Sequence, residues 1–258
     1  MSILEAILLG LLQGLTEFIP VSSSGHLLLA QEVFENGNNL VFDVFLHLGT
    51  LAAILVYFYR DIIKLAQNLF AKNIHGTLAR TIIVATIPAG LVGLAFSGYI
   101  DDNLRRPVVT AIMLVLVALL MIYADKQAEK LKKPAKDISR KQGIIIGIAQ
   151  TAALIPGVSR SGATITTGML LGISKTEAAR FSFLLAIPLV AGSALGLMIQ
   201  DSSELSAGGW QLTLGLLASF ISGLLAIKIL LGILQKVGLK PFAYYRIALA
   251  AVVLIFLV

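Results

Sequence analysis

The chain alternates between long apolar stretches and short polar connections from one end to the other. A helix that crosses a membrane needs about 20 mostly apolar residues. Five stretches meet this criterion and a sixth, shorter one closes the sequence: 40–59, 81–98, 107–124, 181–199, 211–231 and 246–258. The pattern predicts an all-α polytopic membrane protein with about six transmembrane helices.

Two further apolar stretches are too short or too interrupted to be ordinary spans. Residues 3–19 run into the segment IPVSSSGH and residues 143–155 run into IPGVSRSGAT, and a second short apolar run follows each turn, at 27–34 and 165–173. Irregular backbone at membrane depth is tolerated only where it is buried in protein or lines an aqueous cavity. We therefore predict two re-entrant helical hairpins whose tips lie inside the protein.

The basic residues predict the orientation, because cytoplasmic loops carry an excess of Lys and Arg. Sixteen of the twenty fall into four groups, within 60–80, 126–141, 175–180 and 236–246, the last of which ends at Arg246. Placing these groups in the cytoplasm leaves three connections outside, 31–39, 99–106 and 200–209. The assignment requires the segments 1–35 and 142–175 to return to the side from which they start, as re-entrant hairpins do.

Composition supports one membrane domain over residues 1–258. Of the 258 residues, 57% are hydrophobic and only 13% are charged, whereas a soluble domain carries about 25% charged residues. The net charge of +6 lies in connections between apolar spans, so we expect no nucleic-acid partner. The absence of cysteine excludes disulfides and thiol nucleophiles. The N-terminus lacks a basic leader and is interpreted as part of the mature fold.

The two irregular segments are copies of one another. An offset of 137 residues aligns LLGLLQGLTEFIPVSSSGH (8–26) with IIGIAQTAALIPGVSRSGA (145–163) without a gap. The polar or small identities include Gly10 with Gly147, Gln13 with Gln150, Ser22 with Ser159 and Ser24 with Ser161. One copy begins outside and the other in the cytoplasm, so we predict an inverted repeat of 1–124 and 142–258 around a basic linker, 125–141.

Inverted repeats with broken helices place a binding site where their halves meet. Each Ser-Gly turn starts a half-helix, and helix N-termini attract anions, so the two tips predict an anion site. The copies differ in chemistry at three positions, where Glu17 opposes Leu154, Ser23 opposes Arg160 and His26 opposes Ala163. We expect function to reside at these asymmetric positions.

Glu17 is a carboxylate at membrane depth, which costs at least about 2.5 kcal/mol. Gln13 lies four residues earlier on the same helix face. A buried carboxylate here is paired, protonated or bound to a cation. The candidate roles are a structural pair with Arg160, a general acid or base, and a ligand for a hard divalent ion.

Arg160 lies at the second tip, and its guanidinium fork matches phosphate. Ser159, Ser161 and Thr164 flank it with hydroxyl groups. One of the serines is expected to cap the following half-helix, but capping does not explain a buried arginine. We therefore predict phosphate binding by this group.

At the first tip, Ser23 is the candidate nucleophile or hydroxyl donor to the substrate, beside Ser22 and Ser24. His26 is either a proton-transfer residue, since imidazole titrates near neutral pH, or an interhelical hydrogen-bonding residue. His47 is expected to pack in a helix, and His75 to lie in a cytoplasmic loop.

At these residues the sequence resembles the bacterial undecaprenyl-pyrophosphate phosphatase family of the BacA/UppP type. The resemblance lies in a Glu/Gln-x-x-x-Glu motif (Gln13 to Glu17), a Pro-Val-Ser-Ser-x-Gly-His run (Pro20 to His26) and Pro-Gly-x-Ser-Arg-Ser-Gly-Ala-Thr (Pro156 to Thr164). FSFLLAIP (181–188) and PFAYYRI (241–247) extend it over nearly the whole chain. Gln13 departs from members with two glutamates, which puts in doubt any mechanism that requires a carboxylate pair there.

The resemblance implies hydrolysis of undecaprenyl pyrophosphate to undecaprenyl phosphate and inorganic phosphate, in recycling of the lipid carrier for peptidoglycan synthesis, with bacitracin resistance. It implies a divalent cation, Mg²⁺ or Ca²⁺, with Glu17 as its candidate ligand. It also implies a homodimer in the bacterial inner membrane, with the site open to the extracytoplasmic side.

The combined hypothesis divides the candidate residues into two sets. The catalytic set is Glu17, Ser23, His26 and Arg160, with attack by Ser23 or by a water molecule. The substrate-binding set is Gln13, Ser22, Ser24, Gly157, Ser159, Ser161 and Thr164. Reasoning from the residues alone does not separate this enzyme from a transporter or flippase that carries a polyprenyl phosphate through the same anion site.

Overall fold

The computed structural model describes residues 1–34, 40–131, 134–200 and 209–258. In these ranges the regular structure is helical, apart from one isolated bridge between Ala135 and Ile173. The helices are α1 (Ile3–Phe18), α2 (Ser23–Val33), α3 (Leu40–Tyr57), α4 (Tyr59–Gln67), α5 (Ile74–Leu104), α6 (Pro107–Ala128), α7 (Arg140–Thr151), η1 (Ala152–Leu154), α8 (Arg160–Leu170), α9 (Lys175–Gln200), α11 (Gly209–Val237) and α12 (Lys240–Leu257). Most of the predicted connections 31–39 and 200–209 lies outside the described residues.

The predicted transmembrane helices are confirmed. Five of the described helices, α5, α6, α9, α11 and α12, are long and apolar enough to cross a membrane. A sixth span results if α3 and α4, which meet at a bend of 76°, are counted as one. Large apolar side chains on their outer faces, such as Leu94 at 82% exposure, suit contact with lipid.

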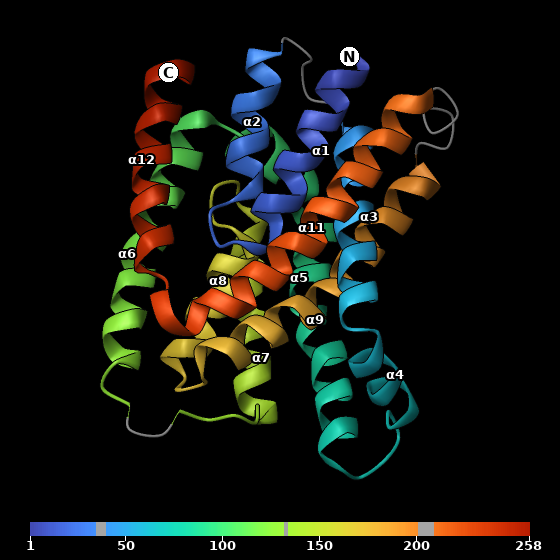
Figure 1. Cartoon of the computed structure of the whole chain (residues 1–258), viewed down its shortest axis with the longest axis vertical. Helices are drawn as coiled ribbons and strands as arrows, with labels where there is room; N and C mark the ends of the chain where they lie inside the picture. The colour runs from blue at the N-terminus through green and yellow to red at the C-terminus, as the bar shows by residue number, and fades with distance from the viewer. Residues whose placement is uncertain (35–39, 132–133, 201–208) are drawn as a thin grey trace.

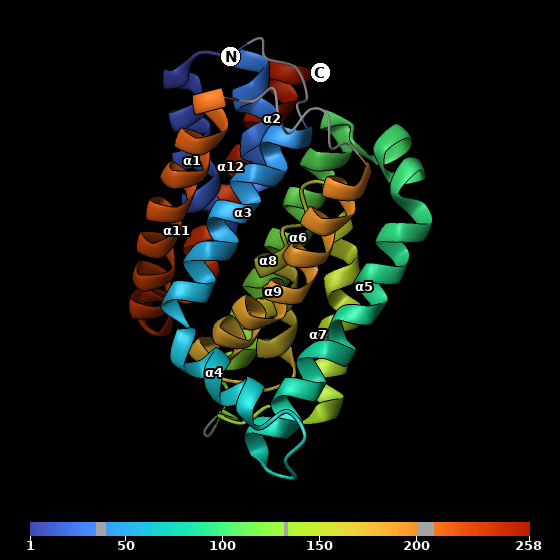
Figure 2. The ribbon, with the colours of Figure 1, turned by 90° about the vertical axis from the view of Figure 1, so that its right-hand side faces the viewer.

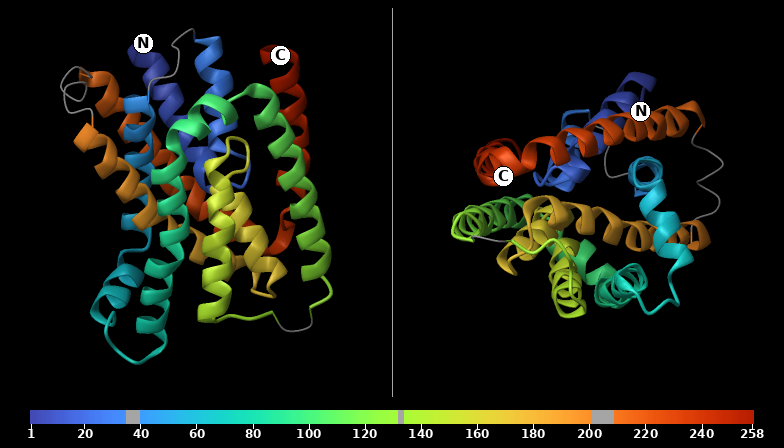
Figure 3. Two further views of the ribbon diagram at one scale, coloured as in Figure 1. Left: turned by 180° about the vertical axis from the view of Figure 1, so that it is seen from behind. Right: turned by 60° about the horizontal axis from the view of Figure 1, so that its bottom comes forward.

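Two helical hairpins enter the molecule without crossing it. In Figure 1, α1 runs from the upper end toward the middle, the chain turns, and α2 returns to the same end. The second hairpin enters from the opposite end, where α7 rises to a turn and α8 descends beside it (Figure 3, left). The two re-entrant hairpins are therefore confirmed, and they point toward each other from opposite ends.

The helix pairings are those that an inverted repeat requires. Helix α1 packs along α11, and α7 packs along α5, while α6 and α12 lie side by side (Figures 1 and 2). Exchanging α1 with α7 and α5 with α11 preserves these pairings. The repeat-related glycines make both approaches possible, because a Cβ at Gly10 would overlap the Gly215 carbonyl of α11, and one at Gly147 would overlap the Ala85 backbone of α5.

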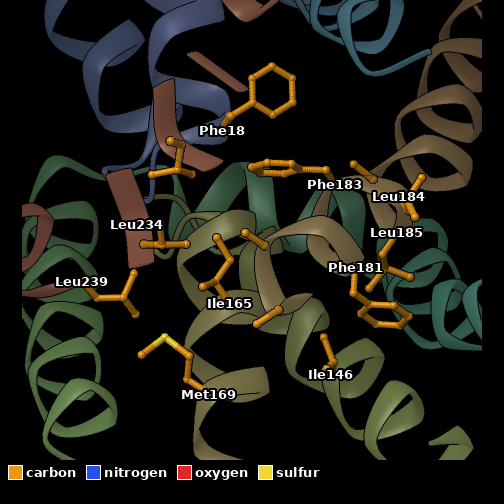
Figure 4. Packing of buried hydrophobic residues seen from close by; sticks show 14 of the residues in the cluster. Phe18, Ile146, Ile165, Met169, Phe181, Phe183, Leu184, Leu185, Leu234 and Leu239 are labelled. Atoms are coloured by element: carbon orange, nitrogen blue, oxygen red, sulfur yellow. The ribbon is translucent and has the colours of Figure 1, made fainter. Parts of the chain in front are cut away.

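The main apolar core joins both hairpins to the spanning helices (Figure 4). Phe18 at the end of α1 packs edge-to-face against Phe183 of α9, with ring centroids 5.2 Å apart. Ile146 of α7 and Ile165 of α8 are fully buried in the same cluster. Because interiors are close-packed, this core fixes the two hairpin tips relative to α9.

Candidate active site

The two turns share an unusual backbone. Ser22 has φ of 74° and Ser159 has φ of 69°, and within the described part of the chain these are the non-glycine residues with positive φ. Each directly precedes an 11-residue half-helix, α2 or α8. Such conformations cost about 1–3 kcal/mol and persist where the surroundings enforce them. The sequence repeat is thus also a repeat of backbone geometry.

The expected serine cap is present at one turn only. The Gly162 N–H donates to Ser159 Oγ at 3.1 Å, so Ser159 caps α8. Ser22 precedes α2 without a side-chain capping bond, and its Oγ lies 3.1 Å from Ser24 Oγ. The first turn therefore leaves the N-terminus of α2 without a serine cap of this kind.

The tips of the hairpins touch. The Gly157 N–H donates to Ser24 Oγ at 3.3 Å, and Ser161 Oγ donates to the Glu17 carbonyl at 3.2 Å. Gly157 has φ of 91°, and a Cβ there would collide with the Thr110 carbonyl. A residue with a side chain is therefore excluded at this contact by both conformation and space.

Arg246 contradicts its prediction as a cytoplasmic cation. It is fully buried, and its guanidinium donates to the carbonyls of Gly157 at 2.7 Å, Val158 at 3.2 Å and Pro20 at 3.4 Å. Further bonds reach carbonyls of α6. The prediction was wrong because α12 begins at Lys240 and carries Arg246 more than one turn into the protein. Arg246 therefore joins the two turns.

The Glu17 carboxylate accepts hydrogen bonds from polar side chains of both hairpins. Its Oε1 accepts a hydrogen bond from the Arg160 guanidinium at 2.7 Å, so the charges form an ion pair. Its Oε2 accepts from Ser23 Oγ at 2.8 Å and from Gln13 Nε2 at 3.0 Å. The Glu17 and Arg160 side chains are only 7% and 9% exposed. Of the alternatives for the buried carboxylate, the structure shows a pair with Arg160.

This cluster forms one side of a cavity of about 370 Å³. Its polar lining near the tips is Glu17, Ser23, Ser24, Gln150, Ser159 and Arg160. Its apolar lining includes Leu27, Leu28, Leu154, Leu189 and Val190. Gln31 of α2, Asp43 in the first turn of α3 and Arg105 directly after α5 also line it. The start of α3 and the end of α5 lie at the end of the molecule opposite α4 (Figure 2). The cavity thus combines a floor of polar and charged side chains with an apolar wall.

His47 differs from its prediction, whereas the contacts of His26 are those of an interhelical hydrogen-bonding residue, one of its two predicted roles. His47 was expected to be a packing residue, but it lines the cavity, with Nε2 3.7 Å from Glu17 Oε2 and Nδ1 2.8 Å from the Asp43 carbonyl. His26 lies outside the cavity lining, and its ring nitrogens contact the Ser22 carbonyl at 2.8 Å and Tyr245 Oη at 2.7 Å. No local signal marks His47, because only the packing of α3 beside α1 brings it to Glu17.

The remaining predicted residues form a layer behind the cavity lining. Thr164 Oγ1 donates to the Arg160 carbonyl at 2.7 Å and lies 2.6 Å from Ser182 Oγ. Ser22 and Ser161 are fully buried at the tips. Gln13 contacts the cavity only through Glu17. These residues support the side chains that line the cavity.

The residues at the cavity floor are compatible with a cation whose ligands come partly from the protein and partly from a bound phosphate. The described residues contain no group of three or more His, Cys, Asp or Glu side chains arranged to hold a metal. Glu17 offers one carboxylate at the floor, beside the Ser23 hydroxyl. Mg²⁺ is commonly held by one or two carboxylates, waters and substrate phosphates, so such an ion is compatible with this donor set.

The arrangement has the parts needed for phosphoryl transfer. A hydroxyl hydrogen-bonded to a carboxylate is a nucleophile with an adjacent base. A guanidinium beside them can bind phosphoryl oxygens and stabilise developing charge. Phosphoryl transfer depends mainly on such positioning and charge stabilisation.

Comparisons with known proteins agree with this chemistry. The sequence profile of the bacitracin resistance protein BacA family matches residues 6–252. A protein of Saccharophagus degradans named undecaprenyl-diphosphatase is 42% identical, with 97% of each chain covered. Another of that name, from Caldicellulosiruptor bescii, is 43% identical over 99% of this chain and 98% of its own. Undecaprenyl-diphosphatase 2 of Stutzerimonas stutzeri is 40% identical, with the same coverage.

Proposed function

The chain belongs to the BacA family of bacitracin resistance proteins, and from this premise we propose that it is an undecaprenyl-pyrophosphate phosphatase. It hydrolyses undecaprenyl pyrophosphate to undecaprenyl phosphate and inorganic phosphate. This reaction returns the lipid carrier to peptidoglycan synthesis, and it underlies bacitracin resistance in the family. The protein acts as an integral membrane enzyme.

The observation that carries this proposal is that Glu17, Ser23 and Arg160 lie together at the floor of a cavity that also has an apolar wall. The substrate has the same division into a charged headgroup and an apolar chain. Its pyrophosphate would lie against Arg160 and the N-termini of α2 and α8. Its isoprenoid would leave along the wall that includes Leu27 and Leu189.

In the proposed reaction, an oxygen nucleophile attacks the terminal phosphorus. Ser23 Oγ, or a water molecule beside it, forms the new P–O bond, and Glu17 Oε2 accepts the proton. Arg160 holds the phosphoryl oxygens, while the bond to the leaving undecaprenyl phosphate breaks. If Ser23 attacks, water then cleaves the phosphoserine and releases inorganic phosphate.

A divalent ion, Mg²⁺ or Ca²⁺, is part of the proposal, with Glu17 and the substrate phosphates as its ligands. When bound, such an ion neutralises phosphate charge. His26 is retained as a predicted proton-transfer residue, although its contacts with Ser22 and Tyr245 favour a structural role. A homodimer is proposed from the family resemblance alone, and the mass of the solubilised particle tests it.

We also propose that the protein lies in the bacterial inner membrane with its cavity open to the extracytoplasmic side. Helix α4, which carries Arg60 and Lys64, lies at the end opposite the junction of α5 and α6 (Figure 3, left). Lys240 at the start of α12 contacts Glu129, which follows the end of α6 away from that junction. The positive-inside tendency puts the α4 end in the cytoplasm. The cavity lining reaches Arg105, at that α5–α6 junction.

Proteoliposomes test the phosphatase against the rival transporter. Purified protein is reconstituted with undecaprenyl pyrophosphate, and phosphate release and lipid translocation are measured on the same vesicles. Phosphate release without translocation is the expected result. Translocation of intact lipid without phosphate release would assign the cavity to transport instead.

A further inference from the structure

Gln150 is a buried amide on the cavity wall that the proposed mechanism does not use. It lies in the last turn of α7, is 1% exposed, and lines the same cavity as Arg160 and Ser159. Within the described part of the chain, neither its Oε1 nor its Nε2 has a hydrogen-bond partner. Buried polar groups are nearly always paired, because burying an unpaired amide is unfavourable.

The repeat explains why this amide has no hydrogen-bond partner among the described residues. Gln13 is the counterpart of Gln150 in the first copy, and its Nε2 donates to Glu17 Oε2 one turn later. In the second copy, Leu154 occupies the position of Glu17 and offers no acceptor. Gln13 Oε1 is also unpartnered, but Gln13 does not line the cavity. Gln150 therefore has both amide atoms unpaired in a residue that lines the space that the substrate would occupy.

We propose that Gln150 binds the pyrophosphate of the substrate. Its Nε2 donates a hydrogen bond to a non-bridging phosphate oxygen, which takes the place of the carboxylate acceptor available to Gln13. Because the amide is neutral, it orients the pyrophosphate without adding to the charge of Arg160. This inference rests on the proposed function and adds a substrate-binding residue to it.

The Gln150→Leu variant tests the inference, since leucine is similar in size and removes both unpaired polar atoms. Hydrogen bonds to charged groups change affinity by about 10- to 100-fold, so KM for undecaprenyl pyrophosphate should rise by that factor. Inorganic pyrophosphate should raise the Tm of the wild-type protein but have little effect on the variant. The Tm without ligand should be unchanged or higher.

Two further variants sharpen the test. Thr151→Val removes the neighbouring hydroxyl, which is also unpartnered but lies outside the cavity lining, and it should leave KM and pyrophosphate stabilisation unchanged. Gln150→Glu keeps the shape and adds a negative charge, so it should weaken pyrophosphate stabilisation at least as much as leucine does. It also serves as the test variant if Gln150→Leu does not fold.

An unchanged KM together with full pyrophosphate stabilisation in Gln150→Leu would overturn the inference. A fall in the ligand-free Tm with stabilisation retained would overturn it as well, because the amide would then be a structural group paired through water. Wild-type protein that pyrophosphate does not stabilise would also contradict it. Since pyrophosphate stabilisation does not require turnover, its selective loss in Gln150→Leu supports the inference even if the proposed hydrolysis fails.

Discussion

Substituting Arg246 tests whether the contact between the two hairpin tips is needed for activity. The guanidinium bonds to Gly157, Val158 and Pro20 in the two turns and to two carbonyls of α6. Arg246→Met keeps much of the apolar volume and removes every one of these donors. Arg246 does not line the cavity. A loss of activity in the folded variant would therefore result from displacement of the hairpin tips.

The expected size of the effect follows from two opposing contributions. Each hydrogen bond from a charged donor contributes about 1.5–3 kcal/mol, and three of them hold the turns. Burying a guanidinium away from water costs several kcal/mol, which offsets much of that gain. The variant also removes the two bonds to α6 and leaves buried carbonyls without donors. We therefore expect the free energy of unfolding to fall by about 3–5 kcal/mol. Turnover should fall by about 100-fold, because displacing reacting groups by about 1 Å has that effect.

The assay is phosphate release from undecaprenyl pyrophosphate in detergent, with thermal unfolding followed by circular dichroism. Arg80→Met is the matched control, because Arg80 also donates to backbone carbonyls, those of Leu69 and Ala71, but lies outside the cavity lining. It should change kcat/KM by less than about twofold. If Arg246→Met folds and retains turnover within threefold of the wild type, the tips do not depend on this residue and the reasoning fails.

Three further outcomes follow from the same geometry. Glu17→Gln should lower kcat by about 10²- to 10⁴-fold, because it removes the base and the partner of Arg160; an activity assay on protein that circular dichroism shows to be folded checks this. Gly147→Ala should lower the free energy of unfolding by about 1–3 kcal/mol, since its Cβ overlaps Ala85, whereas Gly232→Ala, with open space around it, should not. EDTA should stop phosphate release and added Mg²⁺ should restore it; full activity in excess EDTA would exclude the proposed ion.

Local features of the sequence were sufficient to predict the hairpins. The short apolar runs, each followed by proline and a Ser-Gly turn, specify breaks that the chain makes on its own, and the structure has them at Ser22 and Ser159. The contact between Gln13 and Glu17 follows from their spacing on one helix. The exact span ends were less predictable, as α12 begins at Lys240 rather than at 246.

The repeat brought the two tips together and made a pair between Glu17 and Arg160 a candidate, but contacts between elements that it does not relate were beyond such reasoning. His47 reaches Glu17 because α3 packs near α1, and no nearby residue in the sequence marks that approach. Arg246 was grouped with cytoplasmic cations because its carbonyl partners lie some 90 and 226 residues away along the chain. The lack of a partner for Gln150 likewise emerges only when the surroundings of both copies are compared.

The most direct test of the account compares phosphate release from undecaprenyl pyrophosphate by the wild type, Arg160→Ala and Arg180→Ala. Arg180 is the control, because it forms ion pairs with Asp61 and Glu177 away from the cavity lined by Arg160. We predict that Arg160→Ala folds and loses about 10³-fold in turnover, while Arg180→Ala stays close to the wild type. Near-normal turnover in Arg160→Ala would contradict the assignment of the active site.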